Sequence, residues 1–277
     1  MRALVASAMA VFLLPQVAAA QQQRPLATED PEPLGQGRVR IEAGVSAAQD
    51  AVYPLSGLTG NLLRVPLVGL TFALGPAAEL EITGGPYDRL QITSSDPSAP
   101  RAGIMHVSGN TTHDVDDLVV ATKVRIVEEE GSRPALGVLF AVRLPNSKPA
   151  SGLGQDTTDF SFAGLAGKTF ARVRLAANVG VTIMSEPLNV LKQNDVATYG
   201  LSSAIRVTPW STIVGEVNGH ISTRDGAPPI GTESRGVARV GARLGSGATR
   251  FDAAVGFGLT PTTPTVEATA GVTCVLK

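Results

Sequence analysis

Two side chains with the chemistry of a catalytic pair, His106 and Ser108, lie two positions apart in the segment GIMHVSGN. On an extended chain such positions share one face, so the imidazole could accept the hydroxyl proton for attack on an acyl ester. Asn110 is close enough in sequence to orient the imidazole. However, this short motif lies among Ser, Pro and Gly residues, which favour an ordinary loop. Acyl hydrolysis is therefore an alternative function, and no catalytic residue is assigned.

Residue types that bind metals also occur in this region. They are His106, His113, Asp114, Asp116 and Asp117, and their spacing matches no recognised ligand pattern. An acidic loop before a strand is the simpler interpretation. The chain contains no glycine-rich phosphate loop at a strand–helix junction and no G-x-S-x-G motif. We predict neither a metal nor a cofactor.

A mostly basic set of residues points to solute passage. These residues alternate with apolar neighbours and are predicted to line the lumen of a β-barrel: Arg40, Arg125, Arg174, Arg206, Glu216, Asn218, His220, Arg239, Arg243 and Arg250. Rings of Arg or Lys select anions in pores, so a basic constriction is one interpretation. The other is a plugged lumen in which interlocked salt bridges hold these side chains.

The element that must position such residues is a strand with one wet face. In ARVRLAANVGVTI, residues 171–183, apolar side chains occupy every second position and mostly polar or small ones the others. Successive side chains of a strand point to opposite faces. The same alternation fits a soluble protein with an apolar interior and a membrane barrel with an apolar exterior.

The chain repeats this pattern in about twelve segments, several near the roughly ten residues of a tilted transmembrane strand. The predicted strands are 38–46, 61–73, 79–93, 117–127, 135–144, 159–169, 171–184, 195–207, 211–222, 235–244, 250–259 and 265–276. Short and long connections alternate between them, as in an up-and-down outer-membrane barrel. Segment 61–73 is apolar on both faces apart from Arg64, and Pro66 suggests a bulge or irregular pairing there.

The N-terminus indicates export. Arg2, an uncharged run and the sequence Ala18–Ala19–Ala20 form a secretory signal peptide, residues 1–20. Residues 21–37 are polar and Pro-rich and are predicted to form a periplasmic arm, although residues 24–37 could also lodge inside the barrel. Residues 38–277 form the barrel domain, and no segment after the signal is long and apolar enough for a membrane helix.

Composition excludes some partners. The chain has 23 Lys and Arg residues against 24 Asp and Glu residues, so nothing suggests a nucleic-acid partner. The single cysteine, Cys274, excludes an internal disulfide.

Several segments resemble the exported β-barrel family associated with the meta-pathway of phenol degradation. They are RPLATEDPEPLGQGRVRIEAG, DVDDLVVATKVRIVEEE with PALGVLFAVRLPNS, and TTDFSFAGLAGKTFARVRLAANVG. Members of that family are regarded as outer-membrane proteins of Gram-negative bacteria and are often suspected of moving hydrophobic or aromatic compounds. The resemblance therefore implies an outer-membrane barrel in contact with lipid, and suggests transport.

Together these observations predict an all-β protein, a single up-and-down antiparallel transmembrane barrel. Its expected function is passive passage of a small solute, with hydrophobic or aromatic compounds as candidates. The alternatives are a barrel-embedded lipid acyl hydrolase using His106 and Ser108, and a soluble exported β-domain that binds a ligand. The solute and the oligomeric state are not predicted.

Overall fold

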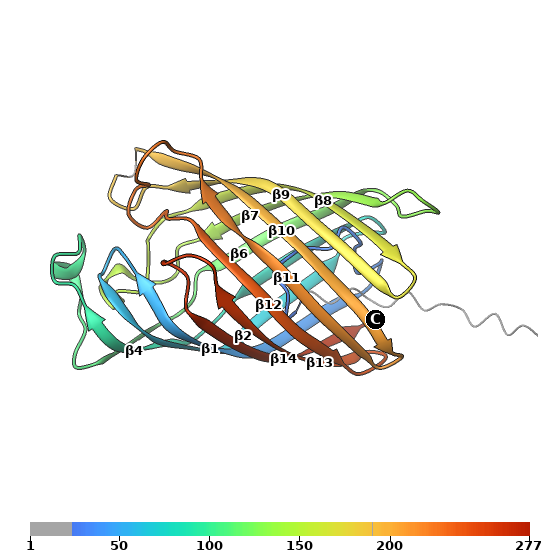
Figure 1. Cartoon of the computed structure of the whole chain (residues 1–277), viewed down its shortest axis with the longest axis horizontal. Coiled ribbons are helices and arrows are strands. Elements are labelled where there is room, and N and C mark those ends of the chain that lie inside the picture. Colours follow the sequence, from blue (N-terminus) through green and yellow to red (C-terminus); the bar gives the residue numbers. More distant parts are fainter. Residues whose placement is uncertain (1–23, 190) are drawn as a thin grey trace, which may run out of the picture.

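The protein is a closed antiparallel β-barrel of 12 strands, as predicted. The computed structural model describes residues 24–189 and 191–277. Consecutive strands are neighbours around the barrel, and pairing between β1 (Val39–Tyr53) and β2 (Leu58–Ala73) closes it. Figure 1 shows the strongly tilted strands, with short turns at the end that carries the C-terminus and longer loops at the other. We call these the turn end and the loop end.

The remaining strands follow in chain order around the wall. They are β3 (Ala78–Gly84), β4 (Asp88–Ser95), β5 (Thr111–Asp114), β6 (Leu118–Val127), β7 (Ala135–Leu144), β8 (Asp159–Phe170), β9 (Val173–Ser185), β10 (Gln193–Thr208), β11 (Ser211–Ser222), β12 (Arg235–Leu244), β13 (Thr249–Gly258) and β14 (Val266–Leu276). Two short 3₁₀ turns, η1 (Ala102–Ile104) and η2 (Pro149–Ser151), lie in loops at the loop end. No helix in the described part of the chain is long and apolar enough to cross a bilayer.

The apolar positions of the alternating pattern lie on the outer surface. Along β13, Phe251, Val255 and Phe257 are exposed, whereas Asp252 and Ala254 between them are buried. Strand β9 shows the same arrangement, with Val179 73% exposed and Ala176 buried. The apolar side chains therefore do not form a buried interior, which favours the membrane interpretation of the pattern over the soluble one.

A bulge explains why segment 61–73 looked apolar on both faces. Val65 and Pro66 together lie opposite Val45 of β1, so the register shifts by one residue. Before the bulge Leu62 is buried and Leu63 exposed; after it Thr71 is buried and Phe72 exposed. Because a one-residue slip exchanges the two faces of a strand, the outward set changes parity within β2. The predicted irregularity at Pro66 is confirmed.

The predicted strand 79–93 is broken into β3 and β4 at residues 85–87. The adjacent wall strand is interrupted beside this break, between β5 and β6, where the Asp116 N–H donates to the Gly85 carbonyl at 2.7 Å. Strand β5, which pairs with β4, lies in the segment between the predicted strands 79–93 and 117–127. Pro86 lacks the N–H that an unbroken strand ladder would require. β5 is only four residues long and is flanked by turn-forming residues, so its sequence does not indicate a strand.

The connection 47–60 between the first two predicted strands is mostly strand. β1 continues as far as Tyr53, and β2 already begins at Leu58. Their inner faces cover a small apolar core formed by Ala48, Ala51, Leu58, Leu62 and Leu90. Met105, Val107 and Leu153 from two loops pack against this core. Small residues such as Ala48 and Ala51 give little strand alternation in the sequence. The loops that bury them are distant in the chain, so only the folded structure shows this burial. The predicted signal peptide, residues 1–20, lies outside the described residues.

Candidate functional site

The N-terminal arm, residues 24–37, lies inside the barrel against the inner wall. The carboxylate of Glu216 accepts the N–H groups of Ala27 and Thr28 at 2.8–3.0 Å. The Asn178 side chain both accepts the Glu29 N–H at 2.7 Å and donates to the Glu29 carbonyl at 2.8 Å. These bonds to the peptide backbone attach the arm to β11 and β9. Of the two expected locations, the structure places residues 24–37 in the lumen.

Carboxylates of the arm pair with basic residues of the wall. Asp30 accepts two hydrogen bonds from Arg174, at 2.7 and 2.6 Å. Glu29 contacts Lys123 at 3.1 Å, and Glu32 pairs with Arg125. Such bidentate and charge-assisted contacts are the strong class of hydrogen bond. Arg125 and Arg174, two of the cations predicted to form a basic constriction, are therefore paired with acidic partners from the arm.

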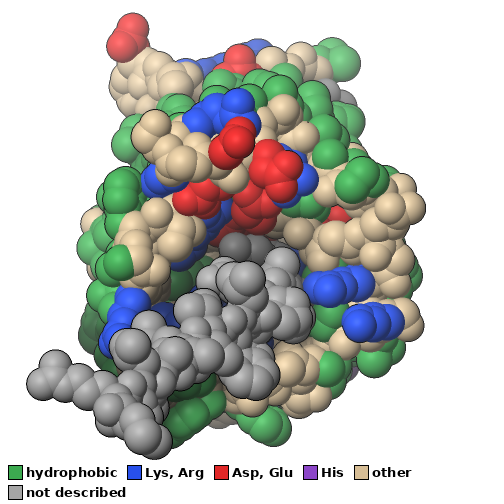
Figure 2. All heavy atoms as spheres, turned by 90° about the vertical axis from the view of Figure 1, so that its right-hand side faces the viewer, with side chains coloured by type: hydrophobic (Ala, Val, Ile, Leu, Met, Phe, Trp, Pro, Cys, Tyr) green, Lys and Arg blue, Asp and Glu red, His purple; other side chains and the backbone are tan. Residues whose placement is uncertain are grey.

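Arg174 also pairs with Glu129, which belongs to the turn between β6 and β7. Partial burial alone would raise the pKa of Glu129, but the Thr169 N–H bond and the nearby cations hold this pKa below its ordinary value. Figure 2, which views the turn end, shows acidic and basic side chains gathered at this mouth.

Wall glycines make room for the arm. A Cβ at Gly44 would lie 2.3 Å from the Arg24 guanidinium, and one at Gly271 would lie 2.6 Å from it. A Cβ at Gly200 would lie 2.9 Å from Thr28 Oγ1. The guanidinium of Arg24 donates to Thr269 Oγ1 at 2.9 Å across this glycine surface. A side chain at Gly44 or Gly271 would require the Arg24 guanidinium to move, and one at Gly200 would lie directly against the Thr28 side chain.

Beneath the arm lies a buried cluster of charges. Lys123 contacts Glu79 at 2.7 Å and Glu81 at 3.4 Å. Arg40 contacts Glu42 at 3.2 Å. Buried ion pairs are costly to break by removing one partner, because the other charge remains uncompensated. This cluster therefore stabilises the polar part of the wall against which the arm lies.

Loops close the opposite end of the barrel. We call the segments 96–110, 145–158, 186–189, 191–192 and 223–234 the loop cap. The Arg101 guanidinium donates to the carbonyls of Gln155 at 2.9 Å and Pro187 at 2.7 Å. The Gln155 amide donates to the Gly231 carbonyl at 3.0 Å. Burial lowers the pKa of Arg101, whose hydrogen bonds run to carbonyl groups.

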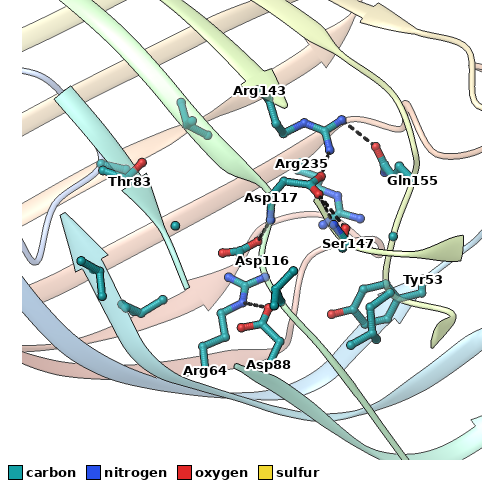
Figure 3. A pocket seen from close by; sticks show the side chains of 18 of the residues that line it. Tyr53, Arg64, Thr83, Asp88, Asp116, Asp117, Arg143, Ser147, Gln155 and Arg235 are labelled. Carbon is teal, nitrogen blue, oxygen red and sulfur yellow. Dashed lines mark hydrogen bonds and ion pairs between the residues drawn. The ribbon is translucent and has the colours of Figure 1, made fainter. Parts of the chain in front are cut away.

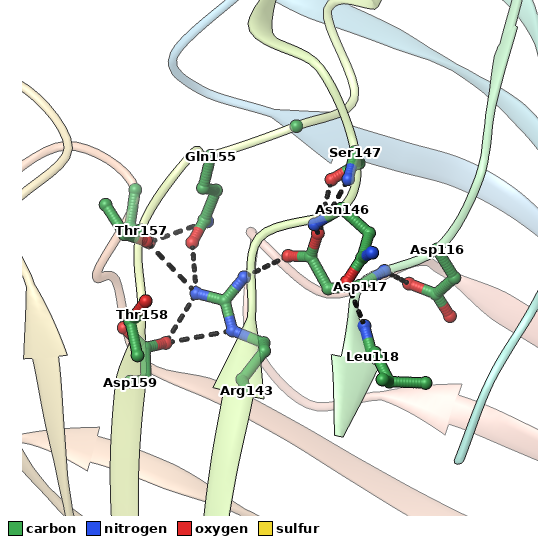
Figure 4. A network of polar contacts seen from close by, with 12 residues as sticks. Asp116, Asp117, Leu118, Arg143, Asn146, Ser147, Gln155, Thr157, Thr158 and Asp159 are labelled. Carbon is green, nitrogen blue, oxygen red and sulfur yellow. Dashed lines mark hydrogen bonds and ion pairs between the residues drawn. The ribbon is translucent and has the colours of Figure 1, made fainter. Parts of the chain in front are cut away.

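A second arginine anchors the loop after β7 to the wall (Figure 4). Arg143 pairs with Asp117 and Asp159, and also donates to Gln155 at 2.9 Å. Asp117 in turn accepts the N–H groups of Asn146 and Ser147, each at 3.0 Å. This network fixes the position of Gln155 at the loop end.

A chamber of about 550 Å³ lies between the arm and the loop cap. The arm contributes Arg24, Leu26 and Ala27 to its lining, and the loops contribute Leu55 and 152–155. Apolar groups such as Leu67 and Met184 alternate with polar ones on the walls. Figure 3 shows Tyr53, Arg64, Asp116 and Arg235 projecting into this space.

The residues predicted to line the lumen have different positions: some form ion pairs, some hold the arm, some border the chamber and some lie toward the turn end. Arg40, Arg125, Arg174 and Arg239 form ion pairs, and Arg243 donates to the Arg24 carbonyl at 2.8 Å. Glu216 holds the arm, and His220 lines the chamber with its Nε2 2.9 Å from the Glu233 carbonyl. Asn218 is half-buried next to these residues on β11, whereas Arg206 and Arg250 lie toward the turn end, away from the chamber lining.

His106 and Ser108 are both exposed in the loop 96–110. Within the described residues no hydrogen bond joins their side chains, and the His106 N–H donates to the Ala150 carbonyl at 2.8 Å. No group of three or more His, Cys, Asp or Glu residues within ranges 24–189 and 191–277 is placed to hold a metal ion.

Sequence reasoning missed the loop-cap residue Arg101 and the chamber residues Tyr53 and Asp88. It also missed the role of the arm carboxylates. One signal was available for the carboxylates: Glu29, Asp30 and Glu32 are clustered in a segment that precedes a barrel with a predominantly basic inner face. Charge complementarity could have located the arm within the barrel.

No family model and no curated protein sequence matches the chain. Among solved structures, an outer membrane channel of Pseudomonas putida F1 is similar, with a TM-score of 0.63 and 13% identity over 91% of this chain and 100% of that chain. The translocator domain of the autotransporter NalP from Neisseria meningitidis has a TM-score of 0.51 and 14% identity over 85% of this chain and 88% of that chain. At these identities the likeness concerns the fold.

Proposed function

We propose that this protein is a gated outer-membrane channel for a small solute. The observation that carries the proposal is the chamber between the arm and the loop cap, inside a barrel with an apolar outer surface. The similar Pseudomonas structure is described as an outer membrane channel, which supports the proposal. The resemblance to the phenol-degradation family favours hydrophobic or aromatic solutes. Apolar groups in the chamber lining are compatible with such compounds.

The first test concerns the membrane. Val255 lies outward on β13 between Val240 and Ala268 of the adjacent strands. In a bilayer, V255K should destabilise the barrel by about 2–4 kcal/mol, whereas T249K at the strand end should cost about 0–1 kcal/mol. Folding into phospholipid vesicles, followed by heat-modifiable gel migration, measures the difference. Equal stability of the two variants would contradict a lipid-facing surface, because a Lys exposed to water costs little at either position.

The second test concerns the arm. If a solute must displace the arm, locking the arm to the wall should stop passage. Position 200 is suited to this, since a Cβ there would lie 2.9 Å from Thr28 Oγ1, close to the approach that a disulfide requires. We expect oxidised T28C/G200C, in a C274A background, to abolish solute-driven swelling of proteoliposomes and reduction to restore it.

The T28C/C274A variant under the same oxidant is the matched control, because it cannot form the cross-link. Swelling that is equal in the oxidised and reduced forms of T28C/G200C/C274A would show that passage does not require the arm to move. The readout is independent of which solute the protein carries in the cell, since small sugars serve as the probe.

A further inference from the structure

We propose that the chamber binds a small organic anion, with its carboxylate at Arg235, Arg64 and Tyr53 and its apolar part against the surrounding leucine and methionine side chains. The inference rests on the proposed channel function and specifies the class of solute. It is carried by an arginine that has no partner among the described residues and lines a partly apolar chamber.

Arg235 begins β12 and lines the chamber. Within the described ranges its guanidinium makes neither a hydrogen bond nor an ion pair. Among acidic groups Glu233 attracts Arg235 most strongly, and its carboxylate accepts the Gly231 N–H at 2.9 and 3.0 Å. Arg235 is half-buried, and its guanidinium presents five N–H donors in a planar fork. A carboxylate in the chamber would satisfy it.

Two further donors border the same space. Arg64 uses its Nε for Asp88 at 3.2 Å, while 35% of its side-chain surface is accessible from inside the barrel. The Tyr53 hydroxyl has no hydrogen-bond partner among the described residues, and this side chain interacts electrostatically with both Arg64 and Arg235. In Figure 3 Tyr53 and the two arginines border one open region. Bidentate arginine contacts and a hydroxyl donor are typical of carboxylate recognition.

The carboxylates of the chamber are already engaged. Asp117 accepts from Arg143 and from the backbone of Asn146 and Ser147. Asp88 pairs with Arg64 through one oxygen, and its other oxygen is buried away from the open space. Asp116 accepts the Asp117 N–H at 2.9 Å and interacts with Arg64. The chamber therefore offers donors to a ligand more readily than acceptors, which favours an anion over a cation.

The ligand also needs an apolar portion. Leu26, Leu55, Leu67, Leu153 and Met184 line the chamber beside these donors. Ligand sites commonly combine an apolar lining with a few convergent polar groups that fix orientation. An aromatic or alkyl carboxylate has this composition, and a cavity of about 550 Å³ accommodates one.

Isothermal titration calorimetry on the purified full-length barrel tests the inference with four probes: benzoate, hexanoate, benzyl alcohol and benzylammonium. We expect both carboxylates to bind, with benzyl alcohol weaker than benzoate by about tenfold or more. R235Q should lose benzoate affinity by about tenfold or more, R235K should retain part of it, and Y53F should weaken it several-fold. R206Q, which removes the same charge outside the chamber, should bind as the unmodified protein does.

Benzyl alcohol or benzylammonium binding as tightly as benzoate would overturn the inference, and so would unchanged affinity in R235Q. Absence of binding by every probe would overturn it as well. Heat-modifiable migration of each variant shows that the barrel has folded. Proteoliposome swelling with arabinose separates the two proposals: passage of arabinose without benzoate binding would leave the channel function standing and reject only the anion site.

Discussion

Removal of arm residues 25–35 is expected to raise the single-channel conductance of the barrel several-fold. The arm crosses the lumen and is held there by Glu216, Asn178, Lys123 and Arg174. Eight-stranded barrels are filled by their own wall side chains and those of 16–18 strands leave an aqueous channel, so a barrel of 12 strands can enclose a path when no segment fills it. Planar-bilayer recordings at matched salt measure the change.

A milder variant separates arm displacement from damage caused by the deletion. N178A removes two hydrogen bonds to the backbone of Glu29, together worth about 1–3 kcal/mol. It should increase the population of the displaced arm by about 5- to 160-fold. S161A, which removes the Ser161–Thr182 hydroxyl contact away from the arm, is the control. Equal conductance of the deletion variant and the unmodified protein would show that the arm is no barrier.

R101A should release the loop cap. This single side chain joins residues 154–155 to Pro187 through three hydrogen bonds, with distances of 2.7–3.3 Å. Hydrogen bonds to a charged group contribute about 1.5–3 kcal/mol each, so the loss should destabilise the closed cap without unfolding the barrel. Hydrogen exchange of residues 149–158 and 186–189 should accelerate strongly, whereas that of the wall strands should change little.

R101K and R133A serve as the comparison for this result. R101K keeps the charge but not the planar fork, so its exchange rates should be intermediate. Arg133 lies in the exposed turn between β6 and β7, where it pairs with Glu130, and R133A should leave the loop cap unchanged. If the cap segments exchange equally slowly in R101A and the unmodified protein, the apolar core beneath the loops is sufficient to hold the cap closed.

The charges inside the lumen form pairs between the wall and the arm, and not a ring of basic residues. Arg125 and Arg174, which alternate with apolar neighbours along their strands, each contact an acidic partner from the arm. The salt bridges are therefore formed between segments more than ninety residues apart, and they favour the plugged lumen over an open basic constriction. Removal of the arm should expose these cations, so anion preference is expected to increase in the deletion variant.

The barrel itself was determined by information local to each strand. Alternation such as that of residues 171–183 specifies which side chains lie outward, and short turns force consecutive strands to pair, so the closed antiparallel wall could be predicted from the sequence. The tertiary structure decided the interior. The pairing of β5 and the approach of Arg101 to Pro187 depend on contacts between residues distant in the chain. No periodicity records such contacts, because hydrogen bonds between irregular segments follow from where the folded wall brings them together.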